Sequence, residues 1–173
     1  MLIMTITLIM TGCSKEESTS EKLEVNIAYQ YGLSYAPFEI MKEKKILEEK
    51  LGGVQINWHL MSSGGAMNEG IISGDIDIAL MGTAPFLIGY DKGIDYKIIS
   101  SIASQKISLI TNDTNLTDLS KFPTTDKIAL PSIGSIKHLA LAMAAKDQLG
   151  EAKALDMNVV NMSSPEAYQA VVS

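Results

Sequence analysis

The sequence predicts an α/β protein of two lobes, each with a mainly parallel sheet and flanking helices, and with the second lobe incomplete. Three observations support this prediction. From Leu23 onward, strand-like and helix-like segments alternate along the chain, a turn-rich stretch after residue 111 interrupts the alternation, and the same order then starts again. Strand–turn–helix alternation gives parallel sheets that are covered by helices on both faces.

The first lobe is predicted over residues 23–111. Apolar–polar alternation indicates a strand at 23–29, and short apolar runs between turn residues indicate further strands. The expected strands are 23–29, 54–60, 76–81, 96–103 and 107–111. The expected helices are 36–45, 46–51, 66–73 and one that begins in Gly82-Thr83-Ala84-Pro85 and ends near Gly93.

Residues 112–126 are predicted to carry the chain from lobe one to lobe two, because 112–123 is polar and rich in turn residues. Beyond them, residues 127–173 are predicted to form part of lobe two. Strands are expected there at 127–130 and 157–161, and helices at 135–149 and from Ser164-Pro165 onward.

The second lobe repeats the first at a spacing of 101 residues. Residues 26–63 align with 127–164 without a gap, and eight of the 38 aligned positions are identical, whereas chance gives about two or three. In the first copy Ser73 is followed by a Gly-Asp-Ile-Asp run and a buried strand, whereas the second copy ends at Ser173, near the counterpart of Ser73 once a one-residue deletion is allowed. We therefore expect a chain truncated at its C-terminus, with about half of lobe two present.

Charge and composition exclude several classes of protein. All 14 basic residues are lysines, and with 20 acidic residues the net charge is 14 − 20 = −6, so no basic surface for nucleic acid is expected. A hydrophobic content of 46% excludes bulk disorder. The single Cys excludes an internal disulfide, and His59 has no neighbours suited to a metal site. We expect neither a metal nor a cofactor.

The N-terminus has the pattern of an export signal. Residues 1–10 form an apolar run that is too short to span a bilayer, which takes about 20 helical residues. The small residues before Cys13 resemble the lipobox of bacterial lipoproteins, in which cleavage leaves the cysteine as the lipidated first residue. We therefore expect a signal peptide at 1–13, lipidation of Cys13, a polar tether at 14–22 and attachment to a membrane surface. A buried free thiol is the alternative.

Four loops lie after a strand and before a helix, at the carboxyl end of a predicted parallel sheet, where open α/β folds bind ligands. They are 30–35, 62–65, 82–84 and 132–135. Each places small or hydroxyl residues and unpaired N–H groups at a helix start, which favours an anion. Because the chain has no Arg, backbone N–H groups, hydroxyls and Lys137 or His138 are left to hold it. Taken singly, each loop is also explained as an ordinary helix cap.

Other candidate residues are explained by local structure. Asp75 and Asp77 follow Gly74 and are typical of a turn. Ser135 and His138 have helical spacing, but serine at a helix start is more often a cap than a nucleophile. No nucleophile is paired with a base, so the residues do not predict an enzyme.

Residues 68–85, which read NEGIISGDIDIALMGTAP, resemble the signature of solute-binding proteins of ABC importers in the nitrate, sulfonate and taurine group. Further matching motifs are Tyr35-Ala36-Pro37, Lys42-Glu43-Lys44, Lys92-Gly93-Ile94 and Pro131-Ser132-Ile133-Gly134-Ser135. The resemblance covers residues 25–173. It implies the type II periplasmic-binding fold, in which two lobes close on a small molecule and the chain returns to lobe one after completing lobe two.

By position, the resemblance implies ligand contacts in both lobes. They are Gln30, Tyr31, Tyr35, Ser63, Gly64, Thr83 and Ala84 in lobe one, and Ser132, Gly134 and Ser135 in lobe two. The implied function is a monomeric, lipid-anchored binding protein on the outer face of the cytoplasmic membrane. It would capture a small oxyanion such as an aliphatic sulfonate, taurine or nitrate, and deliver it to the permease and ATPase subunits of an importer. Ligand would stabilise the closed lobes, which the permease recognises.

Two other functions remain open on the sequence. Relatives in this family bind a thiamine-precursor pyrimidine, and such a flat heterocycle would stack on Tyr31, Tyr35 or Tyr168. A pyrimidine-phosphate synthase and a menaquinone-pathway dehydratase share the fold, but the cysteine-rich motif of the synthase is missing here and both enzymes work inside the cell. The resemblance therefore favours a binding protein over an enzyme.

Overall fold

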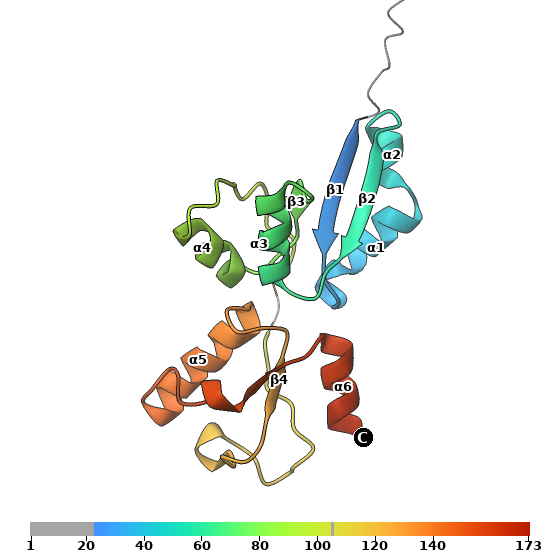
Figure 1. The fold of residues 1–173 in the computed structure, drawn as a ribbon. Coiled ribbons are helices and arrows are strands. Elements are labelled where there is room, and N and C mark those ends of the chain that lie inside the picture. Colours follow the sequence, from blue (N-terminus) through green and yellow to red (C-terminus); the bar gives the residue numbers. More distant parts are fainter. Residues whose placement is uncertain (1–22, 105) are drawn as a thin grey trace, which may run out of the picture.

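The computed structural model describes residues 23–104 and 106–173, which form two α/β lobes joined by a long connecting segment (Figure 1). The expected signal peptide at 1–13 with Cys13, and the tether at 14–22, lie outside the described residues. Within the described part, no helix combines the length and the apolar character that crossing a bilayer requires.

Lobe one is built on a three-stranded parallel sheet with the strand order β2-β1-β3. The strands are β1 (Glu24–Tyr29), β2 (Gln55–Leu60) and β3 (Ile78–Ala79). The helices are α1 (Ala36–Glu43), α2 (Ile46–Lys50), α3 (Gly64–Ser73) and α4 (Thr83–Asp91), and a 3-10 turn, η1 (Leu33–Tyr35), precedes α1. Figure 1 shows α1 and α2 beside β1 and β2, and α3 and α4 on the side of β3.

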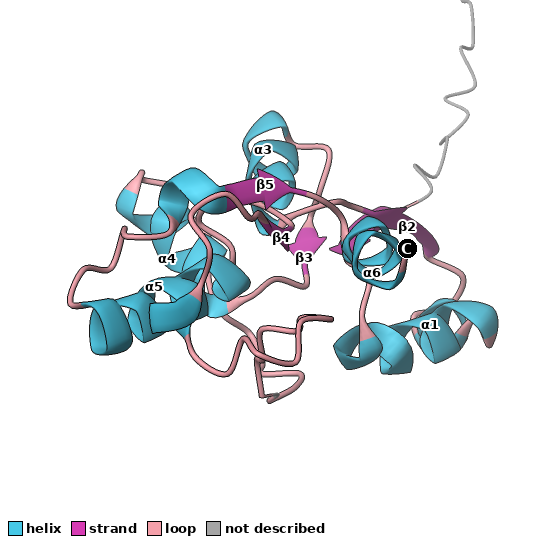
Figure 2. Cartoon of the chain, turned by 90° about the horizontal axis from the view of Figure 1, so that it is seen from below, coloured by secondary structure: helices cyan, strands magenta, loops and turns pink. Residues whose placement is uncertain are grey.

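Lobe two is smaller and has one parallel strand pair, β4 (Ile128–Leu130) with β5 (Val159–Asn161). Its helices are α5 (Ile136–Leu149) and α6 (Ser164–Val172), and its 3-10 turns are η2 (Leu119–Lys121) and η3 (Asp156–Asn158). Figures 1 and 2 show α5 and α6 on either side of the strand pair. The helices of both lobes therefore flank parallel strands, as the sequence predicts.

Each lobe has its own buried cluster. In lobe one it consists of Ala28, Met67 and Ile76. In lobe two it consists of Leu119, Ile128, Leu130, Leu141, Ala145 and Leu155. Leu119 lies in the segment predicted as the crossing, and its N–H donates to Gln148 Oε1 of α5 at 2.9 Å. The middle of the 112–126 segment therefore packs with lobe two, while the position of the hinge stays a prediction.

The internal repeat is confirmed at the level of strand register. The equivalent pairs are Ile27 with Trp58 and Ile128 with Val159, each residue of the second pair lying 101 positions after its counterpart. The hydrogen bonds that follow the second strand repeat as well, from Met61 N to Tyr29 O (2.8 Å) and from Met162 N to Leu130 O (2.9 Å). The two lobes thus share one plan of strand pairing, which eight identities alone could only suggest.

The strands predicted at 96–103 and 107–111 are wrong. The described residues of both segments are irregular and, apart from the half-buried Tyr96, exposed; the side chains of Ile99 and Ile110 are 83% and 74% exposed. Their isoleucine-rich pattern is typical of strands, but a strand forms only where a neighbouring backbone completes its hydrogen bonds. The described part of the chain offers these segments no such neighbour.

The tight contact between α3 and α4 is tested by Gly64→Ala. A Cβ at Gly64 would lie 2.5 Å from Cγ of Pro85, whose ring cannot rotate away. We expect the free energy of unfolding to fall by about 1–3 kcal/mol, the usual cost of overpacking. Chemical denaturation of the chain measures it.

The matched control is Gly65→Ala, one residue along the same helix, where the nearest atom to the added Cβ is Ser63 Oγ at 3.7 Å. This substitution should leave stability unchanged or raise it by up to about 1 kcal/mol, because alanine favours the helix. Equal effects of the two substitutions would contradict the proposed packing.

Candidate functional site

The starts of α3, α4 and α5 lie together, beyond the carboxyl ends of β2, β3 and β4. Gly64 begins α3 and touches Pro85 of α4. Gly82, just before α4, is so close to α5 that an added Cβ would lie 2.9 Å from Cβ of Ile136. A Cβ at Gly134 would lie 3.0 Å from Cδ1 of Ile88 in α4. Three of the four loops predicted from the sequence therefore meet across the two lobes.

Serine side chains cap two of these helices. Ser63 Oγ accepts a hydrogen bond from Ala66 N, and Ser135 Oγ accepts one from His138 N, both at 3.2 Å. Each cap takes up the third N–H of its helix. Within the described residues, the first two N–H groups of α3, α4 and α5 have no hydrogen-bond partner, and they belong to Gly64, Gly65, Thr83, Ala84, Ile136 and Lys137. Such groups, at the positive ends of helix dipoles, suit an anion.

Lys137 adds a cationic side chain at the start of α5. It is the second residue of α5, and its Nζ donates to Ser164 Oγ at the start of α6, at 2.8 Å. Burial lowers the pKa of Lys137 from its usual 10.5. A cation at a helix start is also disfavoured by the helix dipole. An anion bound beside it would offset both effects.

The structure buries some of the side chains predicted to touch a ligand. Ala84 is 6% exposed and Ser135 is 7% exposed. The N–H of Gly134 donates to Nδ1 of His138 at 3.2 Å. Ser63, Thr83 and Ser132 keep partly or fully exposed positions. In this conformation the buried residues reach a ligand through backbone groups or not at all, and the assignment of all ten residues as contacts stays a prediction.

The remaining three candidates in lobe one come from the fourth predicted loop, which follows β1. Gln30 is linked to α3, because its Nε2 lies 3.8 Å from Sδ of Met67. Tyr31 is 50% exposed. Tyr35 ends η1, directly before α1, and burial raises the pKa of its hydroxyl. Tyr31 is therefore more accessible to a ligand than Tyr35, which is partly buried.

Comparison with known proteins identifies the family. Residues 18–168 match the NMT1-like family. The chain belongs to this family. No curated protein matches the chain at a significant level.

This NMT1-like chain is also similar to two solved structures of binding proteins. The first is the periplasmic aliphatic sulphonate binding protein SsuA from Escherichia coli, with a TM-score of 0.59 and 21% identity over 87% of this chain and 50% of that one. The second is the alkanesulfonate-binding protein SsuA from Xanthomonas axonopodis pv. citri bound to MOPS, with a TM-score of 0.56 and 22% identity over 85% of this chain and 50% of that one. The likeness confirms the predicted fold class, and the chain spans about half the length of each structure.

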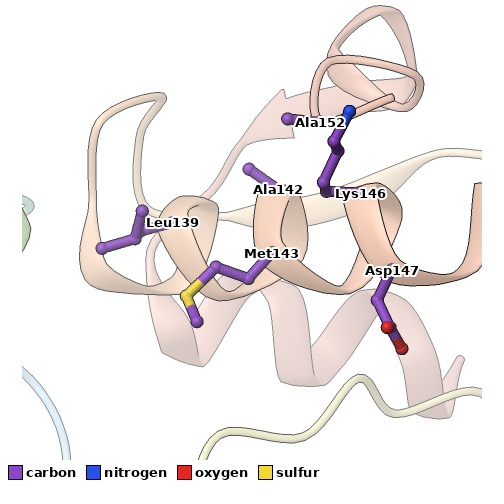
Figure 3. A pocket seen from close by; sticks show the side chains of 6 residues that line it. All are labelled: Leu139, Ala142, Met143, Lys146, Asp147 and Ala152. Atoms are coloured by element: carbon purple, nitrogen blue, oxygen red, sulfur yellow. The ribbon is translucent and has the colours of Figure 1, made fainter. Parts of the chain in front are cut away.

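Two grooves lie in the surface of the described part of this NMT1-like chain. One of about 220 Å³ lies between the lobes, lined by α3, α4 and the 132–134 loop, and includes Ser132 and Gly134. The other, of about 620 Å³, is a shallow apolar groove on α5 (Figure 3). Its lining residues Leu139, Met143 and Lys146 are spread along α5, from its fourth residue to near its far end. Only the first groove adjoins the helix starts.

Residues judged structural from the sequence have structural partners. Asp77 Oδ2 accepts hydrogen bonds from Asn26 N (2.8 Å) and Asn26 Nδ2 (3.2 Å), which ties β1 to the entry of β3. His59 Nε2 lies 3.1 Å from Asn26 Oδ1. Among the described residues, no group of three or more His, Cys, Asp or Glu side chains could hold a metal ion.

Sequence reasoning missed two parts of the site. Ile136 has an unpaired N–H at the start of α5 and forms the contact with Gly82. Its apolar side chain does not mark it in the sequence as part of a binding site. Ser164 was seen only as the start of a helix, whereas its hydroxyl accepts from Lys137. The 101-residue repeat places Ser164 opposite Ser63, which is the one signal that could have found it.

The burial of Lys137 predicts a pH dependence of stability. Its pKa is lower in the folded chain than in the unfolded one, so its charge destabilises the fold below the folded pKa, and this penalty fades as pH rises toward 10.5. We therefore expect the parent chain to gain stability relative to Lys137→Met between pH 7 and pH 10. Urea unfolding of both proteins at the two pH values tests this, and a constant difference or a relative loss would contradict it.

Proposed function

We propose that this chain is part of an extracytoplasmic solute-binding subunit of an ABC importer, and that it captures a small oxyanion such as an aliphatic sulfonate, taurine or nitrate. The subunit acts as a monomer, is not an enzyme, and passes its ligand to the permease. The family and the likeness to SsuA support a binding protein. The ligand class rests on the geometry of the helix starts.

One observation carries the choice of an anion. The starts of α3, α4 and α5 carry six unpaired N–H groups, to which both lobes contribute, and α5 also carries the half-buried ammonium of Lys137. Three positive helix ends and a cation repel one another unless negative charge lies between them. An oxyanion with several acceptor oxygens can accept from more than one helix start at once.

The same arrangement supplies a mechanism of capture. Donors of α3 and α4 belong to lobe one, and donors of α5 to lobe two, so a ligand that accepts from both stabilises the arrangement in which the lobes are in contact. A ligand shifts a conformational equilibrium by its difference in affinity for the two states. The permease then needs only to distinguish the ligand-bound arrangement.

Calorimetric titration of the chain with ethanesulfonate, taurine, nitrate and MOPS tests this function. We expect binding of at least one of these anions, and we expect Lys137→Met to weaken it by about 10- to 100-fold, the effect of losing one hydrogen bond to a charged group. The absence of heat with every anion would overturn the ligand class, and binding of a flat pyrimidine in their place would support the alternative ligand.

Lys146→Met is the matched control, since Lys146 lies near the far end of the same helix and donates to Gly150 O at 2.8 Å. This variant removes the same charge and should bind as the parent chain does. An equal loss of affinity in both variants would mean that net charge, and not the position of Lys137, governs binding.

We also propose that the protein is anchored by a lipid on Cys13. The basis is the sequence, in which an apolar run ends in Thr11-Gly12-Cys13 and is followed by polar residues. Cells that express the chain should incorporate radiolabelled palmitate, and Cys13→Ser should abolish the label. A chain that stays unlabelled and remains in the cytosol would contradict both the anchor and the role in import.

A further inference from the structure

His138, in the first turn of α5, has a partner at each ring nitrogen. The N–H of Gly134 donates to Nδ1 at 3.2 Å, and Nε2 lies 3.1 Å from Oδ1 of Asp156 in η3. The two side chains are only 15% and 28% exposed. The ring therefore bridges the loop before α5 and the turn before β5.

These partners define the protonation state of the ring. A backbone N–H is always a donor, so Nδ1 must carry a lone pair to accept from Gly134. The hydrogen of the neutral ring is then on Nε2, from which it donates to the carboxylate of Asp156. Both contacts are satisfied only in this tautomer, and a proton added at Nδ1 would face the Gly134 N–H as a second donor.

Gly134 has a positive φ and contacts both the loop and lobe one. Its φ of +83° lies in the left-handed region that favours glycine. The loop closes through a hydrogen bond from Ser135 N to Ser132 O at 3.1 Å. On its other side, Gly134 packs against Ile88 of α4 in lobe one. The bond to His138 therefore fixes the part of the loop that contacts lobe one.

We propose that His138 is a positioning residue for the 131–135 loop, and that protonation of its ring releases Gly134 and loosens the contact of this loop with α4. The loop change follows from the geometry alone. Its effect on ligand capture rests on the proposed function, because the loop leads directly into the unpaired N–H groups of Ile136 and Lys137.

The charged groups around the ring come from several elements. Asp156 of η3 contacts Nε2, and Lys137 precedes His138 on α5 but directs its Nζ to Ser164. The 131–135 loop contains no titratable residue. On the lobe-one side, Glu69 and Lys92 line the groove that Gly134 borders. Asp156 is therefore the charged group in direct contact with the ring among these residues.

Nuclear magnetic resonance of the ¹⁵N-labelled chain without ligand tests the proposal. Long-range ¹H–¹⁵N spectra should show the Nε2–H tautomer of His138 at pH 8. When the pH is lowered from 8 to 5, the Gly134 amide signal should change together with the signals of the His138 ring. Its hydrogen-exchange protection should fall by roughly fivefold, the change expected for one ordinary hydrogen bond.

Two variants separate this role from a general effect of pH. In His138→Asn the side-chain oxygen takes the place of Nδ1 and does not titrate, so Gly134 should keep its protection at both pH values. His59→Asn removes the other histidine, which bonds to Asn26 in lobe one, and should retain the full response of Gly134.

Three results would overturn the proposal. They are the Nδ1–H tautomer at pH 8, a Gly134 amide signal that does not change when the His138 ring is protonated, and a Gly134 amide in His138→Asn that responds to pH as it does in the parent chain. If His138→Asn does not fold, the tautomer and the Gly134 shift in the parent chain decide the matter. Since no ligand is present, failure of anion binding leaves this test intact, and success of anion binding does not rescue it.

Discussion

Direct contact of backbone at Gly64 and Gly82 holds the starts of α3, α4 and α5 against one another, and the candidate site depends on it. Any side chain at Gly64 would meet the ring of Pro85, and any at Gly82 would meet Ile136 across the two lobes. This close approach brings together the positive ends of three helix dipoles, which is electrostatically unfavourable in the absence of negative charge. The same contacts therefore account both for the packing of these helices and for the anion affinity that we propose.

The hydrogen-bond donors at this edge divide into two groups with different roles. Ser63 and Ser135 cap the third N–H of their helices, and His138 accepts from Gly134, so these groups fix the shape of the loops. The first two N–H groups of each helix remain for a ligand, as the geometry of a helix start leaves them. Ser63, Gly134 and Ser135, which were predicted as contacts by position, thus also shape the site through these hydrogen bonds.

The strands of both lobes could be predicted because their pattern is local. Alternating apolar residues in β1 and β2, and the repetition of this order in β4 and β5, are visible within windows of a few residues. The same local pattern failed at 96–103 and 107–111, where Ile99 and Ile110 are exposed and no neighbouring strand is present in the described residues. A single segment can have the residue pattern of a strand, but it forms a strand only when a neighbouring strand pairs with it.

The sequence by itself determined the fold class and the repeated plan of strand pairing, since each depends on residue order and on spacing along the chain, and it predicted the loops at which we propose that a ligand binds. The tertiary structure decided which donors at those loops are free, because the partners come from distant segments: Ser164 for Lys137, Asp156 for His138 and Ile136 for Gly82. Such contacts join residues that are 18 to 54 positions apart, and their distances follow from how the helices pack and not from the order of the residues.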